Sequence, residues 1–339
     1  MAYFKASPED FLVDEIALYP AIGTGPHTFV RIEKRLRTTE EVAEDLAQAF
    51  GLKRRDVGYA GRKDRVGVTR QWFSLPDIDP ERVTAAVLPD AKVLEAVRHQ
   101  NKLRTGHLRG NKFEIWVRGL TEAETEAAVA RLETVKQLGF ANRYGAQRFG
   151  RDGDNARRAL VILHRGAAPK DRRRARFLLS ALQAEVFNRV LDERPLEIGQ
   201  LEVGDLAVKH ESGGVFCVED VEADNARARI FEISPTGPMF GTKVAQPLGA
   251  PAQREAKILT EYGVPNQQDL KAPRGVSLKG ARRSLRVLPT EFAHQIDADA
   301  MKISVTLPSG SYATVLLEEV FGPLREGADV IPDGEGILA

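Results

Sequence analysis

Gly58-Tyr-Ala-Gly-Arg-Lys-Asp-Arg-Val-Gly-Val-Thr-Arg-Gln-Trp72 is the stretch of this 339-residue sequence that decides how the rest is interpreted. Residues 57–60 and 69–75 are β-prone, and the polar segment between them holds two glycines that suit a tight loop. The loop region carries one carboxylate, Asp64, among the cations Arg62, Lys63, Arg65 and Arg70. Positive neighbours favour an ionised carboxylate, which can act as a base or a nucleophile. A surface ion pair is the alternative interpretation.

Apolar and polar residues alternate on both sides of this stretch, which predicts further strands over residues 11–15, 29–32, 113–117 and 302–307. Two capping boxes, Thr38-x-x-Glu41 and Thr121-x-x-Glu124, predict that helices begin there. Residues 312–321 continue the strand pattern after a turn. The first part of the chain is therefore predicted to be mixed α+β.

The pattern changes after Gly139, where the chain becomes helical, most clearly over residues 170–193. Apolar residues recur there at helical spacing and form a core-facing stripe of Leu178, Leu182, Val186 and Val190. Residues 196–280 are rich in glycine and proline. Strand patterns at both ends of the chain, with helices between them, predict a discontinuous domain that holds an insertion.

The composition is that of a soluble globular protein, with 42% hydrophobic and 29% charged residues. No uncharged apolar run reaches the roughly 18 residues that a membrane span needs, and the first residues lack the apolar stretch of a signal peptide. We therefore expect a cytoplasmic protein without membrane association. Cys217 is the only cysteine and the six histidines stand in no metal-ligand spacing, so neither a disulfide nor a metal site is expected.

Charge is segregated along the chain, although the net charge is only +1. Basic residues outnumber acidic ones seven to two over 51–72, five to none over 98–112, eleven to three over 143–176 and six to none over 271–286. Each block alone is also typical of a solvated helix surface. Together they favour an anionic polymer as partner, and the clustered arginines Arg172, Arg173, Arg174 and Arg176 suit phosphate oxygens.

Two further segments have the composition of a nucleic-acid contact. Asn142-Arg-Tyr-Gly-Ala-Gln-Arg-Phe-Gly150 interleaves Arg143 and Arg148 with two aromatic rings, which suits an unpaired strand because arginine binds phosphate and rings stack on bases. In Gly110-Asn-Lys-Phe113, the amide of Asn111 can bond a base edge and Phe113 can stack on a base. A packed turn with buried rings and a turn-capping asparagine are the respective alternatives.

Five segments, taken in chain order, resemble the TruD family of tRNA pseudouridine synthases. They are Lys5-x-x-Pro8-Glu-Asp-Phe11-x-Val13-x-Glu15, the Gly58 to Trp72 stretch, Gly110-Asn-x-Phe113, Asn142-x-x-Gly145-x-Gln-Arg-Phe-Gly150 and Leu307-Pro-x-Gly-Ser-Tyr-Ala313. The resemblance spans nearly the whole chain. It implies an α+β pseudouridine-synthase catalytic domain, residues 1–138 and 287–339, with a mixed or antiparallel sheet flanked by helices. A family-specific α+β insertion domain interrupts it at residues 139–286.

The resemblance also implies a reaction and the residues that perform it. The family converts a uridine of tRNA to pseudouridine, typically at position 13, without a cofactor or a metal ion. Asp64 corresponds to the catalytic aspartate, and Lys5 to the basic residue that pairs with it and keeps it ionised. The pocket for the target uridine corresponds to Phe11, Asn111, Phe113 and Tyr312.

Two positions depart from the family pattern. Tyr312 stands where phenylalanine is usual, which keeps a stacking face and adds a hydroxyl that needs a partner. Val66-Gly67 varies the signature after the catalytic Asp-Arg and bears on the shape of the loop.

The residues expected along the RNA backbone are Arg62, Lys63, Arg65, Arg143, Arg148, Arg172, Arg173 and Arg174.

The expected chemistry suits an enzyme that acts on tRNA without a cofactor, and a monomer is expected because the sequence shows no exposed apolar stripe that demands a partner. Breaking the C1′–N1 bond, rotating the uracil and rejoining it through C5 needs one carboxylate and no external donor. Asp64 either attacks C1′ or removes the 2′ proton, and the sequence does not choose between them. The alternatives are a catalytically idle RNA-binding protein on the same scaffold and an anion-binding metabolic enzyme, for which no phosphate-binding loop is present.

Overall fold

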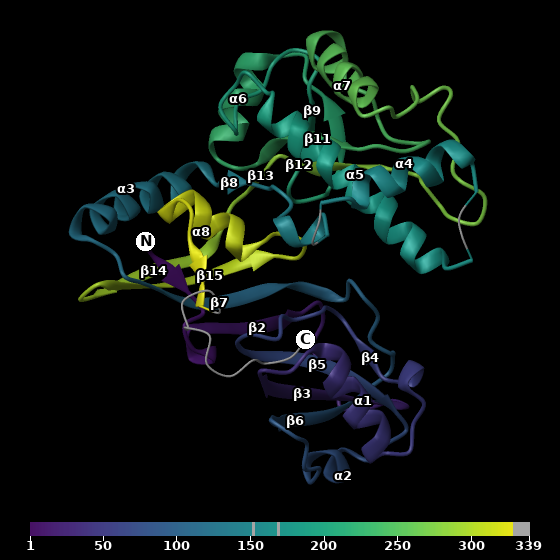
Figure 1. Ribbon diagram of the computed structural model, residues 1–339, viewed down its shortest axis with the longest axis vertical. Helices are drawn as coiled ribbons and strands as arrows, with labels where there is room; N and C mark the ends of the chain where they lie inside the picture. The colour runs from purple at the N-terminus through teal and green to yellow at the C-terminus, as the bar shows by residue number, and fades with distance from the viewer. Residues whose placement is uncertain (151–152, 168–169, 328–339) are drawn as a thin grey trace. The chain divides into compact units, whose positions relative to one another are not determined.

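The computed structural model describes residues 1–150, 153–167 and 170–327, and the chain divides into two compact units (Figure 1). The first unit comprises Met1–Leu132, Pro289–Ala313 and Val320–Ala339, and the second comprises Glu133–Leu288 and Thr314–Glu319. The sequence placed the limits of the insertion at 139 and 286. Residues 328–339 of the expected catalytic domain lie outside the described residues. The roles of the two units as catalytic and insertion domains stay predictions.

A mixed sheet forms the centre of the first unit. Its strands run in the order β14 (Thr290–Asp297), β15 (Ala300–Pro308), β7 (Leu108–Arg118), β2 (Phe11–Ala17), β5 (Val68–Pro76), β3 (His27–Arg35) and β6 (Ala91–His99). Three short strands join it, β1 (Tyr3–Phe4), β4 (Gly58–Tyr59) and β16 (Arg325–Glu326). Neighbours along the order pair antiparallel, except β2 and β5, which pair parallel. The strands predicted on both sides of the Asp64 loop are confirmed.

Helix α1 (Thr39–Ala49) begins where the first capping box predicts. The Thr38 Oγ1 accepts a hydrogen bond from the Glu41 N–H (3.1 Å), and the Glu41 carboxylate accepts one from the Thr38 N–H (2.6 Å). The helix shares a core with β3 and β5 that includes Val30, Ile32, Val42, Leu46 and Phe73. The next helices in the chain are α2 (Pro80–Thr84) and α3 (Glu122–Leu138), and α3 follows the second capping box.

Segment 312–321 forms helix α8 (Ala313–Phe321), so the expected strand is wrong there. The reason is the spacing of its apolar residues. Four of its five buried side chains lie three or four positions apart, at Ala313, Leu316, Leu317 and Val320, and Val315 is the fifth. This spacing places one stripe on a helix, whereas a half-buried strand would need strict alternation.

The second unit combines an antiparallel sheet with helices. The sheet order is β10 (Val215–Cys217), β9 (Leu206–Lys209), β11 (Ile233–Met239) and β12 (Ala281–Ser284), and β8 (Phe140–Ala141) pairs with β13 (Arg286–Val287). The helices are α4 (Asn155–Arg165), α5 (Arg172–Asp192), α6 (Val221–Arg229) and α7 (Gly249–Glu261). The predicted apolar stripe of α5 is buried. The alternation pattern does not locate this sheet, because β9, β10 and β12 span only three or four residues and because proline and glycine interrupt β11. Both units are α+β, as the family resemblance implies.

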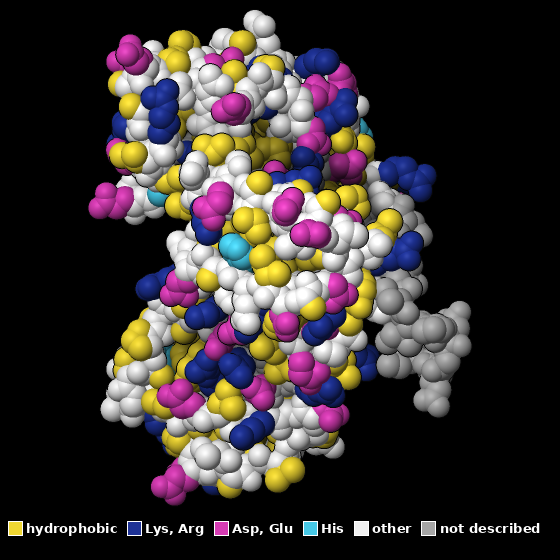
Figure 2. Space-filling model, turned by 90° about the vertical axis from the view of Figure 1, so that its left-hand side faces the viewer, with side chains coloured by type: hydrophobic (Ala, Val, Ile, Leu, Met, Phe, Trp, Pro, Cys, Tyr) yellow, Lys and Arg dark blue, Asp and Glu magenta, His cyan; other side chains and the backbone are white. Residues whose placement is uncertain are grey.

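The surface of the chain is polar and carries both signs of charge. On the face shown in Figure 2, Lys and Arg side chains lie among Asp and Glu side chains and do not form one uniformly basic field. Within the described part of the chain, we find no helix with the length and apolar character that crossing a membrane requires.

Candidate active site

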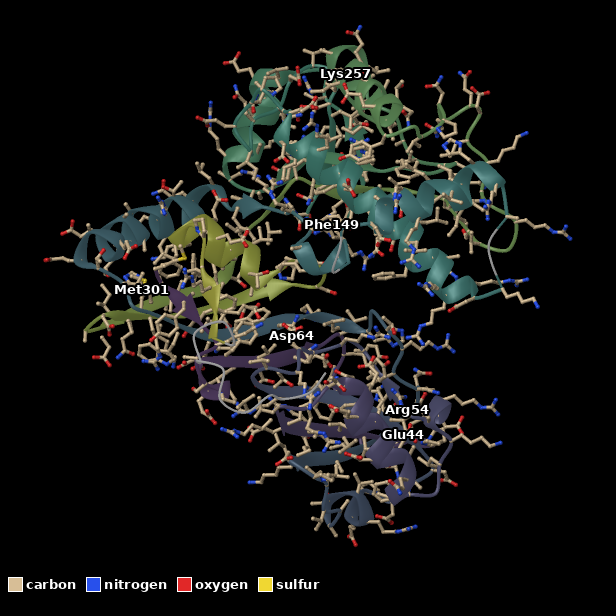
Figure 3. The ribbon with its side chains drawn as sticks, in the orientation of Figure 1. Glu44, Arg54, Asp64, Phe149, Lys257 and Met301 are labelled. Carbon is tan, nitrogen blue, oxygen red and sulfur yellow. The ribbon has the colours of Figure 1, made fainter. Side chains whose placement is uncertain are left out.

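Asp64 lies on the loop between β4 and β5, and its side chain is 46% exposed (Figure 3). The Lys5 Nζ lies 3.6 Å from the Asp64 Oδ2, and the Lys5 side chain is only 3% exposed. The structure therefore brings together the two residues that the resemblance pairs. A buried cation faces a carboxylate that remains accessible.

Lys5 is held in place by its backbone and by its neighbours. It directly follows β1 and adopts a φ of 58°, in the left-handed region that residues other than glycine rarely occupy. Its Nζ lies 4.6 Å from the centre of the Phe11 ring and 3.4 Å from the Glu326 Oε1. The ring face attracts the cation, and two carboxylates balance its charge. Lys5 is thus positioned before any substrate binds.

Buried side chains anchor the backbone of the Asp64 loop. The Gln71 Nε2 donates a hydrogen bond to the Gly61 carbonyl oxygen (3.2 Å), and the Gln71 Oε1 accepts one from the Thr39 Oγ1 (2.8 Å). The Lys63 N–H in turn donates to the Thr39 Oγ1 (2.9 Å). Since Thr39 starts α1 and Gln71 lies on β5, these two elements set the path of the loop.

The structure corrects the prediction for Lys63, which was expected along the RNA backbone. The Lys63 Nζ lies 2.6 Å from the Glu15 Oε2, and the two side chains are 5% and 0% exposed. The Glu15 Oε1 also accepts a hydrogen bond from the Trp72 N–H (3.2 Å). A buried lysine with a buried carboxylate partner does not reach a phosphate. Lys63 instead ties the loop to β2.

A second buried lysine, Lys34 of β3, lies under the same loop and was not predicted. Its Nζ donates a hydrogen bond to the Asp64 carbonyl oxygen (2.9 Å) and another to the Arg37 carbonyl oxygen. Burial lowers the pKa of Lys34 to about 8, although nearby carboxylates raise it. The sequence held a signal, because Lys34 continues the period-two series of Val30 and Ile32 and so faces the core.

Replacing Lys34 by Met is expected to change how stability depends on pH. The pKa of Lys34 falls from 10.5 to about 8 on folding, so the unfolded chain binds more protons between these two pH values. The free energy of unfolding of the wild type therefore gains a favourable contribution as the pH rises from about 8 to 10.5, and Lys34→Met lacks it. Urea unfolding of both proteins across this range measures the difference. Parallel pH dependences would show that Lys34 titrates normally.

The predicted pocket residues lie on neighbouring strands of the same sheet. Phe11 and Phe113 are buried and pack edge to face, with ring centres 6.2 Å apart. Asn111 lies two residues before Phe113 on β7, so the two side chains share a face of the sheet. Within the described residues, the buried Asn111 Oδ1 has no hydrogen-bond partner, which makes it an available acceptor. Tyr312 is partly exposed in the loop after β15.

The departure at Val66-Gly67 has a steric reason at Gly67. Its φ is 138°, and a Cβ at this position would lie 2.6 Å from the Phe11 carbonyl oxygen. Only glycine combines this conformation with so close an approach of two backbones. Gly67 therefore lets the end of the Asp64 loop pass directly over the start of β2.

The sequence profile described as tRNA pseudouridine synthase D (TruD) matches residues 2–166 and 167–320 of the chain. The chain belongs to the TruD family. The reaction of this family is the isomerisation of uridine to pseudouridine in tRNA.

Curated relatives match over almost their whole length. The tRNA pseudouridine synthase D of Anaeromyxobacter sp. (strain Fw109-5) is 40% identical, over 96% of this chain and 93% of its own. The protein of the same name from Geotalea daltonii is 36% identical, over 94% of this chain and 96% of its own. A solved structure from Methanosarcina mazei, also named TruD, superposes with a TM-score of 0.73 at 22% identity, covering 95% of this chain and 94% of that chain. This last likeness shows the shared fold.

Two of the basic residues predicted to contact RNA, Arg62 and Arg65, lie beside Asp64 in the first unit. Arg62 and Arg65 have well-exposed side chains. The Arg62 Nε lies 2.7 Å from the Glu40 Oε1, and the Arg65 Nη1 lies 4.0 Å from the Glu41 Oε1. Exposed ion pairs of this kind are weak, so a phosphate can compete for both arginines.

The remaining predicted RNA contacts, apart from the buried Lys63, lie in the second unit. Arg143 pairs with Asp192, whose hydrogen bond raises the pKa of the guanidinium, and the Arg148 Nη2 donates to the Ser180 Oγ (2.7 Å). The three remaining arginines are exposed at the start of α5, and no acidic partner lies within ion-pair distance of them in the described part of the chain. They are Arg172, Arg173 and Arg174.

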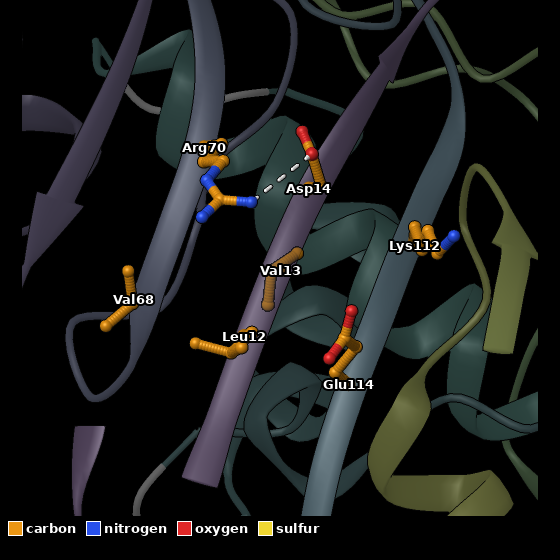
Figure 4. Close-up of a pocket in the computed structure, with 7 residues that line it drawn as sticks. All are labelled: Leu12, Val13, Asp14, Val68, Arg70, Lys112 and Glu114. Atoms are coloured by element: carbon orange, nitrogen blue, oxygen red, sulfur yellow. Dashed lines mark ion pairs between the residues drawn. The ribbon is translucent and has the colours of Figure 1, made fainter. Parts of the chain in front are cut away.

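A hollow of ≈ 220 Å³ lies on the opposite face of the sheet from Asn111 and Phe113. Figure 4 shows the residues that line it. Its lining side chains come from β2, β5 and β7 and include Leu12, Asp14, Val68, Arg70, Lys112 and Glu114. Lys112 and Glu114 alternate with Asn111 and Phe113 along β7, which places them on the other face. The charged groups of the hollow are paired, for example Arg70 with Asp14 at 3.9 Å. It is therefore separate from the Asp64 site.

No metal centre is found within residues 1–150, 153–167 and 170–327. No three His, Cys, Asp or Glu side chains there are grouped so that they could hold an ion. Cys217 is a free thiol.

Proposed function

We propose that this chain converts a uridine of tRNA to pseudouridine at the Asp64 site, with position 13 as the target that the family resemblance implies. The observation that carries the proposal is the Lys5–Asp64 pair, in which a half-exposed carboxylate lies 3.6 Å from a buried ammonium group. The ammonium balances the charge of the carboxylate without covering it. Asp64 is therefore accessible to the sugar of a bound nucleotide.

The isomerisation needs only one such carboxylate. The C1′–N1 bond breaks, the uracil rotates, and C5 bonds to C1′; C5 then loses its proton and N1 gains one. Asp64 acts in one of two ways: it attacks C1′ as N1 leaves and forms an ester that C5 then displaces, or it removes the 2′ proton as N1 leaves and returns it when C5 bonds to C1′. Oxidation state and atom count do not change, so the proposed reaction uses neither a cofactor nor a metal ion.

The target uridine must leave its base stack to reach Asp64. The Asn111 Oδ1, which has no hydrogen-bond partner among the described residues, is an acceptor suited to an N–H of the uracil edge. Phe113 and Tyr312 supply aromatic surface for the base, and the face of the Phe11 ring contacts the Lys5 ammonium group. These contacts offset part of the free energy lost when the base unstacks.

The proposed roles of the two units follow from where these residues lie. Lys5, Asp64, Asn111 and Phe113 all belong to the first unit, which is the proposed catalytic domain. The second unit is the proposed insertion domain, and its exposed arginines at the start of α5 are proposed to bind tRNA phosphates together with Arg62 and Arg65. The protein is proposed to act as a monomer in the cytoplasm.

Tritium release from tRNA that carries 5-tritiated uridine tests the proposal, since the C5 hydrogen leaves in either chemical route. We expect release by the wild type, and carbodiimide modification with primer extension is expected to map the product to position 13. Release with a product at another position would refute the assigned target. Tight tRNA binding without release would instead support an RNA-binding protein that lacks catalysis.

A further inference from the structure

An open groove lies within the second unit, between α5 and the segment 276–281. Its volume is ≈ 400 Å³, within the range of small-molecule binding sites. Four residues of α5 line one wall and part of the floor at helical spacing, Arg176, Leu179, Ser180 and Gln183. The other wall and the floor include Met239, Ser277, Leu278 and Lys279.

Two segments that are far apart in the sequence bring cations together at this groove and beside it, and Arg176 and Lys279 are the cations that line it. The guanidinium of Arg172 lies beside Gly275, 3.2 Å from where a Cβ on that glycine would be. The exposed cations here are Arg172, Arg173, Arg174 and Arg176 on α5, Lys279 on the facing segment, and Lys271 and Arg274 shortly before that segment in the chain. None of these seven has a carboxylate within ion-pair distance in the described part of the chain. The fold thus joins two of the basic blocks of the sequence into one patch.

The interior of the groove differs from its edges. Leu179, Leu278 and Met239 give it an apolar floor, whereas Arg176 and Lys279 stand on its two walls. An apolar slot with cations along its edges fits a nucleotide, because the base packs on the floor while the phosphates meet the cations.

We propose that this groove, between α5 and the segment 276–281, binds an unpaired nucleotide of the RNA substrate. Arg176 and Lys279 contact its phosphates, and the base lies against Leu179 and Leu278. The positive charge of the patch favours anionic ligands over cationic ones. Among anionic ligands, a nucleotide uses both the cations and the apolar floor. The identification of the RNA as tRNA rests on the proposed function. The binding of an unpaired nucleotide in the groove does not depend on that function.

Affinity for a short single-stranded oligouridylate and for a blunt RNA duplex of equal length tests the proposal. Arg176→Gln and Lys279→Gln are each expected to weaken single-strand binding roughly tenfold and to lower the slope of log K against log salt by about 0.7. Ser277→Leu fills the groove without changing charge, so we expect a similar loss of single-strand affinity at an unchanged salt slope. Duplex binding is expected to be unaffected by Ser277→Leu.

Lys257→Gln is the matched control, because Lys257 is an exposed cation of the same unit that pairs with Glu193 and Glu261. It is expected to bind both RNAs as the wild type does. Wild-type affinity of Ser277→Leu for the single strand would overturn the proposal, and so would equal losses for single strand and duplex. These affinities are measured without turnover, so a failure of tritium release would count against the proposed function alone.

Discussion

Asp64→Asn is expected to abolish tritium release from 5-tritiated tRNA, with turnover lower by at least about 10⁴-fold. The amide is neither a base nor a nucleophile, yet it has nearly the size of the carboxylate. Because Asp64 is half exposed and its loop is anchored through Gln71, Thr39 and Lys63, the variant is expected to fold and to bind tRNA with unchanged affinity. Single-turnover kinetics and a binding titration measure the two effects separately.

Asp56→Asn is a suitable control for this prediction. Asp56 lies in the same basic stretch as Asp64, and within the described residues no cation forms an ion pair with it. This variant removes the same charge and is expected to retain turnover. Near-normal tritium release by Asp64→Asn would refute the role of Asp64. An equal loss of turnover in Asp56→Asn would show that removal of one negative charge, and not the position of Asp64, causes the loss.

Glu15→Gln is expected to lower the free energy of unfolding of the first unit by about 3–5 kcal/mol, because it leaves the buried Lys63 ammonium without its counter-charge. The midpoint of thermal unfolding is then expected to fall by roughly 6–20 °C for a unit of this size. Both tryptophans, Trp72 and Trp116, lie in the first unit. Their fluorescence therefore follows unfolding of this unit separately from the second.

The double variant Glu15→Met/Lys63→Met separates lost pairing from lost packing. Replacing both members of a buried ion pair with apolar side chains is commonly neutral or stabilising, whereas removing one is costly. We therefore expect the double variant to be more stable than Glu15→Gln. A double variant that is as unstable as the single one would show that the charges themselves are required for folding.

The sequence predicts the strands and helices that surround Asp64 because their signals are local. The capping box at Thr38 forms in the structure as its spacing predicts, and alternation locates β2, β5 and β7. The sequence does not by itself show which side chains meet across strands. Glu15 and Lys63 form their pair only because β2 and β5 lie next to each other, so Lys63 was assigned to RNA although it is buried.

Part of what was missed was nevertheless present as periodicity. Glu15 follows Phe11 and Val13 at intervals of two, as Lys34 follows Val30 and Ile32, and both charged residues face inward. A charged residue at an inward position of a strand predicts a buried partner. The sheet of the second unit gave no comparable signal, because Pro235, Gly237 and Pro238 interrupt the pattern of β11.

The pairing of β7 with β15 has a consequence for synthesis of the chain on the ribosome. Residues 108–118 emerge long before residues 300–308, with which they pair, and all of the second unit except residues 314–319 is made in between. Until then β7 exposes an unpaired edge, where strands of other chains can add. The contacts of β1 with β16 and of Lys5 with Glu326 form later still. A nascent chain thus completes the surroundings of Lys5 only when its C-terminal strands have been translated.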